Sequence, residues 1–590
     1  MLDPRIYRMG LVPIILGAIV LAFSLTGQPG ALSTTLAPDA YSGSAALATL
    51  NHLVRQYPRR LPGSAGDAGV AGYVSSQLRG EGFTVSTQDF PARTAIGTRQ
   101  LENVVGIRAG QQNGSIVVVS HRDALNAPAA SELSGTATML ELANVLNGET
   151  LQHTLILAST SGSDGAAGAA ALARSLPAPV DAVIVLGDMS GAAVREPVVV
   201  PWSDGQDLAP PVLRNTVAAA LGSQTGIPAG SSGLLTQLTH LAFPVSPTEQ
   251  APFAAQGKSA VLVSLSGERA SSPNQRVSPI SLTAMGRTVL QAVNALDGGP
   301  SVPTPSSYVT LSGKSIPGWA VRVLSLTLIL PVLMATIDGF ARARRRGSAV
   351  LPSLVWVLSA ALPFLAAALL VLFAHAVGWV SAAPPGPLGG AAIRLHGAQL
   401  ALLGGMAFLI VSGLVVLPRL ARRTAGLRAP SDQPHSPELG AAAAILLLLC
   451  VVALAIWFAN PFAALLVVPA LHLWMWIVAP EVRLPGPAAA MLLLAGLALP
   501  GLVAFEYAQT LGLGPLPAAW SWVLLLAGGG IGIVSALEWS VFLGCAISVV
   551  ALALRAVGQP QPEAVPVTIR GPVTYAGPGS LGGTKSALHR

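Results

Sequence analysis

The sequence contains few cysteines and few charged residues. Its two cysteines, Cys450 and Cys545, both lie inside long apolar runs. A disulfide or a thiolate metal site is therefore excluded from the rest of the chain, which must fold around a hydrophobic core alone. Charged residues make up only 10% of the 590 residues, against roughly 25% in soluble domains. With 52% hydrophobic residues, the chain is predicted to contain membrane spans, and its length leaves room for a soluble domain besides.

The net charge of +7 results from arginines gathered at the ends of apolar runs. These are Arg342, Arg344, Arg345 and Arg346 after one run, and Arg419, Arg422 and Arg423 after another. Cations in this position mark the cytoplasmic ends of membrane spans. They indicate the lipid bilayer as a partner, and we expect no nucleic-acid binding.

Apolar runs long enough to cross a bilayer, about 20 residues, occur at both ends of a more polar region. Residues 10–25 follow Arg5 and Arg8 without a clear A-x-A site afterwards, so we expect an uncleaved anchor in residues 1–30 rather than a cleaved signal peptide. A transmembrane helical domain is predicted in residues 317–556, with about eight spans at 318–340, 354–377, 398–418, 439–458, 462–478, 488–505, 519–537 and 539–554. Glu538 is the predicted turn between the last two. Residues 557–590, rich in Pro and Gly, are expected to be a disordered tail.

The arginine placement also predicts a topology. It puts the N-terminus and the loops at Arg344 and Arg422 in the cytoplasm, and the polar region outside. We therefore expect an integral plasma-membrane protein with several spans. Asp338, at the end of one span, is expected to pair with the arginines beside it. Charged residues are scarce within the predicted spans, which disfavours a transporter.

Residues 40–300 alternate between strand and helix patterns. Strands are predicted at 85–90, 103–108, 115–120, 154–159, 182–186 and 260–265, and helices at 45–57, 66–80, 135–146, 166–176, 211–222 and 279–295. Apolar runs such as SIVVVS and HTLILAS are typical of strands buried on both faces of a parallel sheet. The predicted fold class is α/β, a three-layer α/β/α sandwich with a mainly parallel sheet, followed by an all-α polytopic transmembrane domain.

Several motifs follow one another in this α/β region. They are RRLPGSAGDAGVAGYVSSQLRGEGFTV, ENVVGIRAG, VVVSHRDAL, SGTATMLELANVL, VIVLGDMSG and TEQAPFAAQGKSAVLVS. As an ordered set, they resemble the di-zinc aminopeptidase family of metallopeptidases. The resemblance implies a zinc-exopeptidase fold in which imidazole and carboxylate groups hold two zinc ions. These ions activate a shared water, and a glutamate takes its proton as general base.

Three positions of the family's site are kept in this sequence. The resemblance places His121 at the first zinc ligand and Asp188 at the second aspartate ligand of the same metal. Asp123 occupies the position of the aspartate that supports this site. One metal thus keeps two ligands.

The other positions are lost. The bridging aspartate falls on Ser131, a second-metal ligand on Ser163 and the late histidine on Gln250. The general base falls on Gly162, which has no side chain to accept a proton. The resemblance therefore implies a degraded site that cannot perform the family's reaction at this position.

Two further interpretations remain open. Glu132, Asp164 and Glu249 each lie one residue from a lost position, and a slip in register would let them rebuild a single-metal site. Adjacent residues point in different directions, which disfavours such a slip. Alternatively, His121 is a strand-end histidine bonded to Asp123, and the aspartate at position 188 merely caps a turn or helix.

The whole arrangement resembles two membrane groups: the vacuolar and reticular membrane proteases, and the peptidase-like subunit of the GPI transamidase, whose site is degraded. We hypothesise a catalytically inactive, multi-pass membrane protein whose external domain binds a peptide, a peptidoglycan-type ligand or a partner membrane subunit, with no cofactor expected. One alternative is a divergent aminopeptidase-type metallopeptidase with one zinc at His121 and Asp188. The other is a transporter or assembly factor that acts through its spans.

Overall fold

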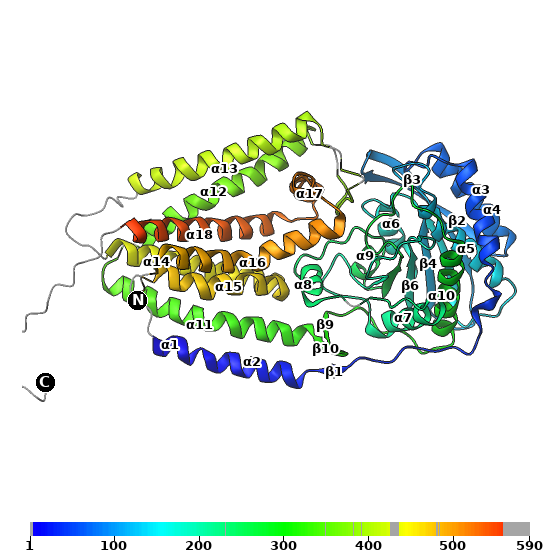
Figure 1. Ribbon diagram of the computed structural model, residues 1–590, viewed down its shortest axis with the longest axis horizontal. Coiled ribbons are helices and arrows are strands. Elements are labelled where there is room, and N and C mark those ends of the chain that lie inside the picture. Colours follow the sequence, from blue (N-terminus) through cyan, green and yellow to red (C-terminus); the bar gives the residue numbers. More distant parts are fainter. Residues whose placement is uncertain are drawn as a thin grey trace, which may run out of the picture.

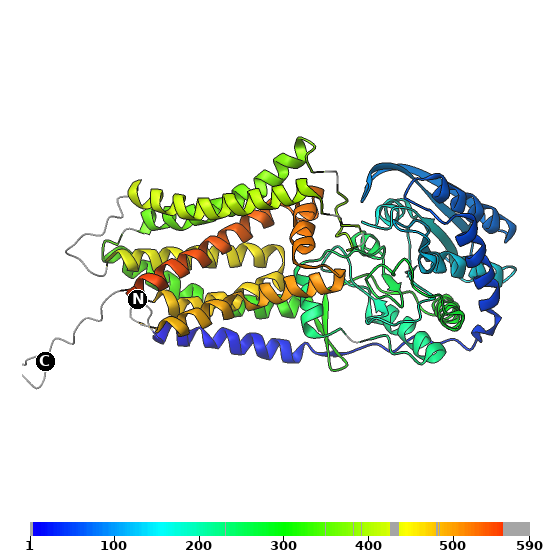
Figure 2. The ribbon, with the colours of Figure 1, turned by 45° about the horizontal axis from the view of Figure 1, so that its top comes forward.

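A computed structural model describes residues 4–558, apart from 231, 349, 381–382, 391, 394, 425–435, 480–481 and 483. Nearly all of the predicted tail, from residue 559 onward, lies outside the described residues. The described chain has two parts along its long axis. An α/β domain occupies one end and a bundle of long helices the other, as both views show (Figures 1 and 2).

The α/β domain is built on a mixed seven-stranded sheet with the order β2-β3-β5-β4-β6-β8-β7. The strands are β2 (Thr84–Thr94), β3 (Gly97–Arg108), β4 (Ser115–His121), β5 (Thr154–Thr160), β6 (Ala182–Leu186), β7 (Val199–Val200) and β8 (Ala260–Val263). The central strands β5, β4, β6 and β8 are parallel, whereas β2, β3 and β7 join the sheet antiparallel. All six predicted strands are present, and the two-residue β7 is the additional one.

Helices cover both faces of this sheet, which confirms the predicted three layers. On one face lie α3 (Gly43–Gln56), α4 (Ala65–Gly80), α5 (Ser134–Val145), α7 (Pro211–Thr225) and α10 (Pro279–Asp297); on the other lie α6 (Ala167–Ser175) and α9 (Ala251–Ala255). Successive strand residues point to opposite faces. Along β4, Ile116 and Val118 therefore enter one core, and Val117 and Val119 the other.

The second of these cores continues into the helical bundle. Helix α8 (Leu234–Ala242) joins the α/β domain to the bundle by packing against α15 (Pro461–Val478) and α16 (Gly486–Leu511). The Nδ2 group of Asn460, the residue before α15, donates to the carbonyl oxygens of Leu241 and Ala242 at 2.8 and 3.1 Å. These bonds satisfy carbonyls at the end of α8 that have no partner within the helix. A three-stranded sheet of β1 (Thr26–Gly27), β9 (Tyr308–Leu311) and β10 (Lys314–Pro317) forms a second connection.

Among the described residues, eight helical segments are long and apolar enough to span a membrane. They are the N-terminal segment Ile6–Phe23, formed by α1 (Pro4–Met9) and α2 (Leu11–Phe23), and the helices α11 (Gly318–Arg345), α12 (Val350–Ala376), α13 (Gly397–Thr424), α14 (Ser436–Ala459), α15, α16 and α18 (Ile533–Gly558). The length and apolar composition of these helices indicate a membrane protein. Asp338 pairs with Arg342 at 2.8 Å, as predicted.

The structure differs from the sequence-based expectation near residue 530. Helix α17 (Pro515–Gly528) has only 14 residues, too few to cross a bilayer. Figure 1 shows it almost end-on, while the long helices run across the view. The chain turns at Gly529, whose φ of +84° suits glycine, and Glu538 lies inside α18. The predicted turn at Glu538 is therefore wrong, because the glycines at 528–530 and 532 interrupt the helix first.

Candidate functional site

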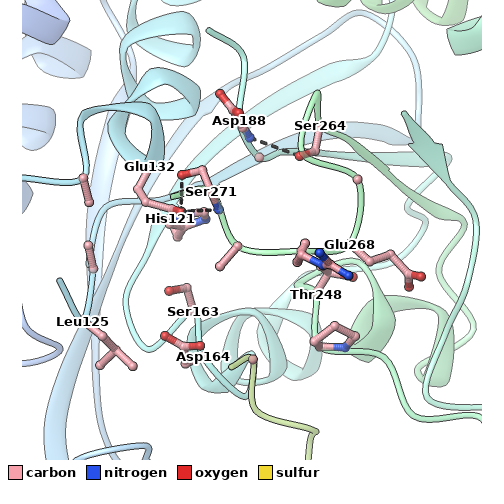
Figure 3. Close-up of a pocket in the computed structure, with 18 of the residues that line it drawn as sticks. His121, Leu125, Glu132, Ser163, Asp164, Asp188, Thr248, Ser264, Glu268 and Ser271 are labelled. Carbon is pink, nitrogen blue, oxygen red and sulfur yellow. Dashed lines mark hydrogen bonds and ion pairs between the residues drawn. The ribbon is translucent and has the colours of Figure 1, made fainter. Parts of the chain in front are cut away.

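The predicted site residues lie at the carboxyl ends of the parallel strands. His121 is the last residue of β4, Ser163 and Asp164 follow β5, and Asp188 follows β6. In α/β sheets, ligands bind at this edge because loops from neighbouring strands meet there. The edge lines a cavity of about 340 Å³. Figure 3 shows Ser163 and Asp164 on one side of it, and Glu132 and Asp188 on the other.

His121 is held between two glutamates. Its Nε2 lies 2.7 Å from Oε2 of Glu132, and its Nδ1 lies 3.5 Å from Oε2 of Glu249. The three side chains are largely buried, with exposed fractions of 12%, 16% and 4%. The second carboxyl oxygen of Glu249 accepts a hydrogen bond from the Thr160 hydroxyl at 2.7 Å. The structure therefore brings together His121 and two of the three residues that a register slip would supply.

Electrostatics make this group an ion pair. Burial alone lowers the pKa of His121, but the hydrogen bonds and charges of Glu132 and Glu249 outweigh it and raise the pKa well above its ordinary value. Burial alone raises the pKa of Glu132, but His121 and Ser271 lower it overall. The raised pKa favours the imidazolium form of His121, in which both ring nitrogens carry a proton.

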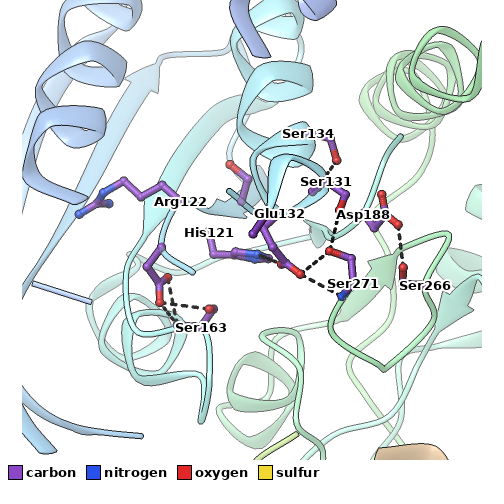
Figure 4. Close-up of polar contacts among 12 residues, drawn as sticks. His121, Arg122, Ser131, Glu132, Ser134, Ser163, Asp188, Ser266 and Ser271 are labelled. Carbon is purple, nitrogen blue, oxygen red and sulfur yellow. Dashed lines mark hydrogen bonds and ion pairs between the residues drawn. The ribbon is translucent and has the colours of Figure 1, made fainter. Parts of the chain in front are cut away.

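Ser131, at the lost bridging position, supports this ion pair. Its hydroxyl donates to Oγ of Ser271 at 2.8 Å, and Ser271 donates to Oε1 of Glu132 from both its hydroxyl (2.5 Å) and its backbone N–H (2.9 Å). Figure 4 shows these contacts around His121. The Ser131 hydroxyl thus helps to orient Glu132 through Ser271.

Asp188 is satisfied by neutral donors. Its Oδ1 accepts from the backbone N–H groups of Ser190 and Gly191 at 3.1 and 2.8 Å. Its Oδ2 accepts from Ser266 Oγ at 2.6 Å and Gln275 Nε2 at 2.7 Å. Burial raises the pKa of this carboxyl, although these hydrogen bonds oppose the effect. The predicted interpretation of Asp188 as a turn cap agrees with its backbone contacts.

The aspartates on the other side of the cavity differ from each other. Asp123 does not pair with His121; it accepts hydrogen bonds from the backbone N–H and the hydroxyl of Ser163, each at 3.2 Å. Burial, with the nearby charge of Asp67, raises the pKa of Asp123 to about 7. Burial and then Glu132 raise the pKa of Asp164 to about 6. Within the described residues, Asp164 has no hydrogen-bond partner.

Gly162 and Gln250 are the two remaining residues that the sequence predicts at lost family positions. Gly162 has φ +83°, and a Cβ atom there would lie 2.7 Å from Cδ1 of Leu101. A glutamate at this position would be strained and crowded. The side-chain amide of Gln250 donates to the carbonyl oxygen of Trp202 at 3.1 Å and to Ser246 Oγ at 3.4 Å. Gln250 is fully buried there, in the core that leads to the helical bundle.

The described residues do not fit a zinc ion. No group of three or more His, Cys, Asp or Glu side chains converges to hold a metal in the part of the chain that is described. A histidine nitrogen and a carboxylate oxygen that share a tetrahedral zinc would be about 3.3 Å apart, given metal–ligand distances near 2.1 Å. The 2.7 Å between His121 and Glu132 is a direct hydrogen bond. The side chains of His121 and Glu132 are thus bonded to each other.

Several residues that shape the site could not be identified from the family's motifs. Ser266, Ser271 and Gln275 hold the two acidic groups from the segment after β8. The same segment carries Arg269, whose Nε donates to the carbonyl oxygen of Thr510 at 3.1 Å, while its Nη2 donates to that of Gln509. The only available signal was the polar composition of the stretch SLSGERASSPNQR.

Comparison with known families identifies the domain that carries this site. Residues 103–257 match the model of peptidase family M28. The chain is thus similar to peptidase family M28 over these residues, and the resemblance predicted from the sequence is confirmed for this stretch. His121, Glu132, Asp188 and Glu249 all lie inside it.

Solved structures similar to the chain include two aminopeptidases and a glutaminyl cyclase. A zinc aminopeptidase from Bacillus subtilis is 12% identical, with 43% of this chain and 94% of that chain covered and a TM-score of 0.36. An aminopeptidase from Aneurinibacillus sp. strain AM-1 is 14% identical, with 45% and 96% covered and a TM-score of 0.37. A glutaminyl cyclase from an Acidobacteriales bacterium is 18% identical, with 46% and 99% covered and a TM-score of 0.37. Among curated proteins, none matches the chain.

Proposed function

We propose that this protein is a non-catalytic membrane protein whose peptidase-like domain binds a ligand without hydrolysing it. The observation that carries the proposal is the placement of both His121 ring nitrogens against carboxylates, Nε2 at 2.7 Å from Glu132 and Nδ1 at 3.5 Å from Glu249. Because both nitrogens face carboxylates, neither is free to coordinate a metal. Without a metal and with Gly162 at the base position, the described cavity lacks the metal-bound water and the glutamate base that the family's reaction uses.

We further propose that residues 40–300 form the ligand-binding domain and that it lies outside the cytoplasm of an integral plasma-membrane protein. Helix α11 supports this orientation. It begins beside β10, next to the α/β domain, and its last turn, at the opposite end of the bundle, carries Arg342, Arg344 and Arg345 (Figure 1). Arginines accumulate on the cytoplasmic side, so the α/β domain belongs on the other side.

A divergent metallopeptidase with a single zinc at His121 and Asp188 is less well supported. Four neutral donors, including Ser266 and Gln275, satisfy both oxygens of the Asp188 carboxyl. A zinc ion would have to displace these contacts as well as the His121–Glu132 pair. Water activation would then still lack the glutamate base that the family uses.

Function through the spans is also less well supported. Intramembrane polar groups are expected to mark transport pathways, but two of those described, His472 and Glu506, bond to neighbouring helices. His472 accepts from the Tyr7 hydroxyl at 2.8 Å, and its other nitrogen lies 2.8 Å from the Leu328 carbonyl oxygen. Glu506 accepts from Thr236 of α8 at 2.8 Å. These contacts favour roles in packing and in docking of the α/β domain.

Peptide hydrolysis by the purified full-length protein tests the proposal. We expect aminoacyl-nitroanilides and short peptides to be turned over no faster by the wild type than by His121→Ala, because the cavity lacks an activated nucleophile. Hydrolysis by the wild type that His121→Ala loses, with both proteins folded, would contradict the proposal and favour the metallopeptidase alternative.

A further inference from the structure

The cavity is closed partly by the membrane helices. Its wall includes Gly389 and Gly390 from the segment between α12 and α13, and Leu511 and Gly512 at the end of α16. The backbone N–H of Gly390 donates to the carbonyl oxygen of Leu511 at 3.3 Å, which joins these two segments. A ligand in this cavity therefore contacts the end of α16 and the segment between α12 and α13 as well as the α/β domain.

Aromatic residues indicate that this end of the bundle lies near the headgroup level of a bilayer. Tyr507 of α16 and Trp522 of α17 have ring centroids 6.5 Å apart, and Trp522 and Trp539 both contact Phe243, just after α8. Tyrosine and tryptophan are enriched where the hydrocarbon core meets water. Because α16 ends four residues after Tyr507, the cavity opens near lipid headgroups.

Two arginines beside the cavity lack an acidic partner. Arg195 and Arg269 line its wall, and the ion pairs of the described residues include neither of them. Burial and then the charge of Arg195 lower the pKa of Arg269, so the two guanidinium groups lie close enough to repel each other. Through Thr510, Arg269 is fixed at the end of α16. Paired, uncompensated cations at this depth favour a phosphate.

The interior of the cavity favours a cation that donates hydrogen bonds. Asp123, Asp164 and Asp188 line it without a cationic partner among the described residues, and the carboxyl of Asp164 has no hydrogen bond there. A primary ammonium offers three donors. A quaternary ammonium offers none and is recognised by aromatic cages, whereas the described lining contains no Trp, Tyr or Phe.

From this arrangement we propose that the cavity binds the headgroup of a membrane phospholipid that carries a primary amine, as phosphatidylethanolamine does. The phosphate contacts Arg195 and Arg269, and the ammonium contacts Asp164. The lipid enters from the bilayer, beside the end of α16 and the Gly389–Gly390 segment. The inference rests on the proposed binding function, since a hydrolytic centre would use the same carboxylates differently.

Lipid binding to the purified full-length protein in detergent tests this proposal. Native mass spectrometry would compare phosphatidylethanolamine, phosphatidylcholine and phosphatidylglycerol with identical acyl chains. We expect phosphatidylethanolamine to bind about tenfold more tightly than the other two lipids. This difference is what one hydrogen bond between charged groups contributes to affinity. Asp164→Asn should remove this preference, and Arg195→Gln should weaken all three lipids severalfold. The matched controls Asp89→Asn and Arg93→Gln, on the exposed face of edge strand β2, should change nothing.

Three outcomes would overturn the proposal. These are equal affinities for phosphatidylethanolamine and phosphatidylcholine, an unchanged preference in a folded Asp164→Asn variant, or binding of soluble phosphoethanolamine with no binding of the lipid. Competition of soluble phosphoethanolamine with the bound lipid would support it, because both present the same headgroup. None of these measurements depends on peptide hydrolysis. A failure of the lipid proposal can therefore be distinguished from a failure of the proposed non-catalytic function, which peptide hydrolysis tests.

Discussion

Replacement of His121 by alanine should destabilise the α/β domain strongly. The substitution removes the cation between Glu132 and Glu249 and leaves two carboxylates buried without compensation. Breaking a buried ion pair by removal of one partner costs about 3–5 kcal/mol. For a domain of this size, each kcal/mol lowers the melting temperature by roughly 2–4 °C, so we expect a decrease of roughly 6–20 °C.

The assay is thermal unfolding of the full-length protein in detergent, followed by tryptophan fluorescence at one scan rate. His52→Ala, on the exposed side of α3, is the matched control and should stay within about 0.5 kcal/mol of the wild type. The double variant His121→Ala/Glu132→Gln should recover part of the loss, because one uncompensated charge is then removed. A chelator should leave the wild-type melting temperature unchanged.

Two results would refute this reasoning. The first is a His121→Ala variant as stable as His52→Ala, which would mean that the ion pair contributes nothing. The second is a wild-type melting temperature that falls with chelator to the value of His121→Ala. That result would assign the stabilisation to a bound metal.

Three more predictions concern pH, the lost base and domain docking. Burial raises the pKa of Asp123 to about 7 and that of Asp164 to about 6 in the folded protein. The folded state therefore favours the protonated carboxyls, and the free energy of unfolding decreases as the pH rises from about 4 through 6 and 7. Asp164→Asn should thus stabilise the protein by about 1–3 kcal/mol at pH 8 and hardly at pH 4; an equal gain at both pH values in thermal unfolding would contradict this. Gly162→Glu should lower the melting temperature by several degrees and restore no peptide hydrolysis, since its Cβ meets Leu101; a stable, active variant would contradict the account. Asn460→Ala should cost about 1–2 kcal/mol by leaving the α8 carbonyls unpaired and should increase protease cleavage around α8; unchanged proteolysis would speak against this contact as a docking bond.

Much of the fold could be predicted because its central strands are buried on both faces. Runs such as Ser115–His121 and Ala182–Leu186 are continuous apolar segments, and their order with the intervening helical patterns defines an α/β sandwich. The short elements could not be predicted. The two residues of β7 have no periodicity, and α8 is defined by its packing against α15 and α16.

The candidate site was only partly predictable, for a different reason. The sequence motifs locate His121 and predict which ligand positions are lost, and they place Glu132 and Glu249 next to such positions. Their pairing with His121 depends on side-chain directions that Ser271 helps to fix from 139 residues away in the chain. The expected pair of His121 with Asp123 was wrong because Ser163 occupies that carboxyl. Such long-range contacts leave no mark in local sequence patterns.

The zinc content of the full-length protein, purified from zinc-replete cells without chelator, tests the central claim most directly. If His121 is an imidazolium between two glutamates, the wild type and His121→Ala will contain the same amount of zinc, far below one ion per chain. One zinc ion per wild-type chain, lost in His121→Ala, would show that the histidine is a metal ligand and would contradict the account.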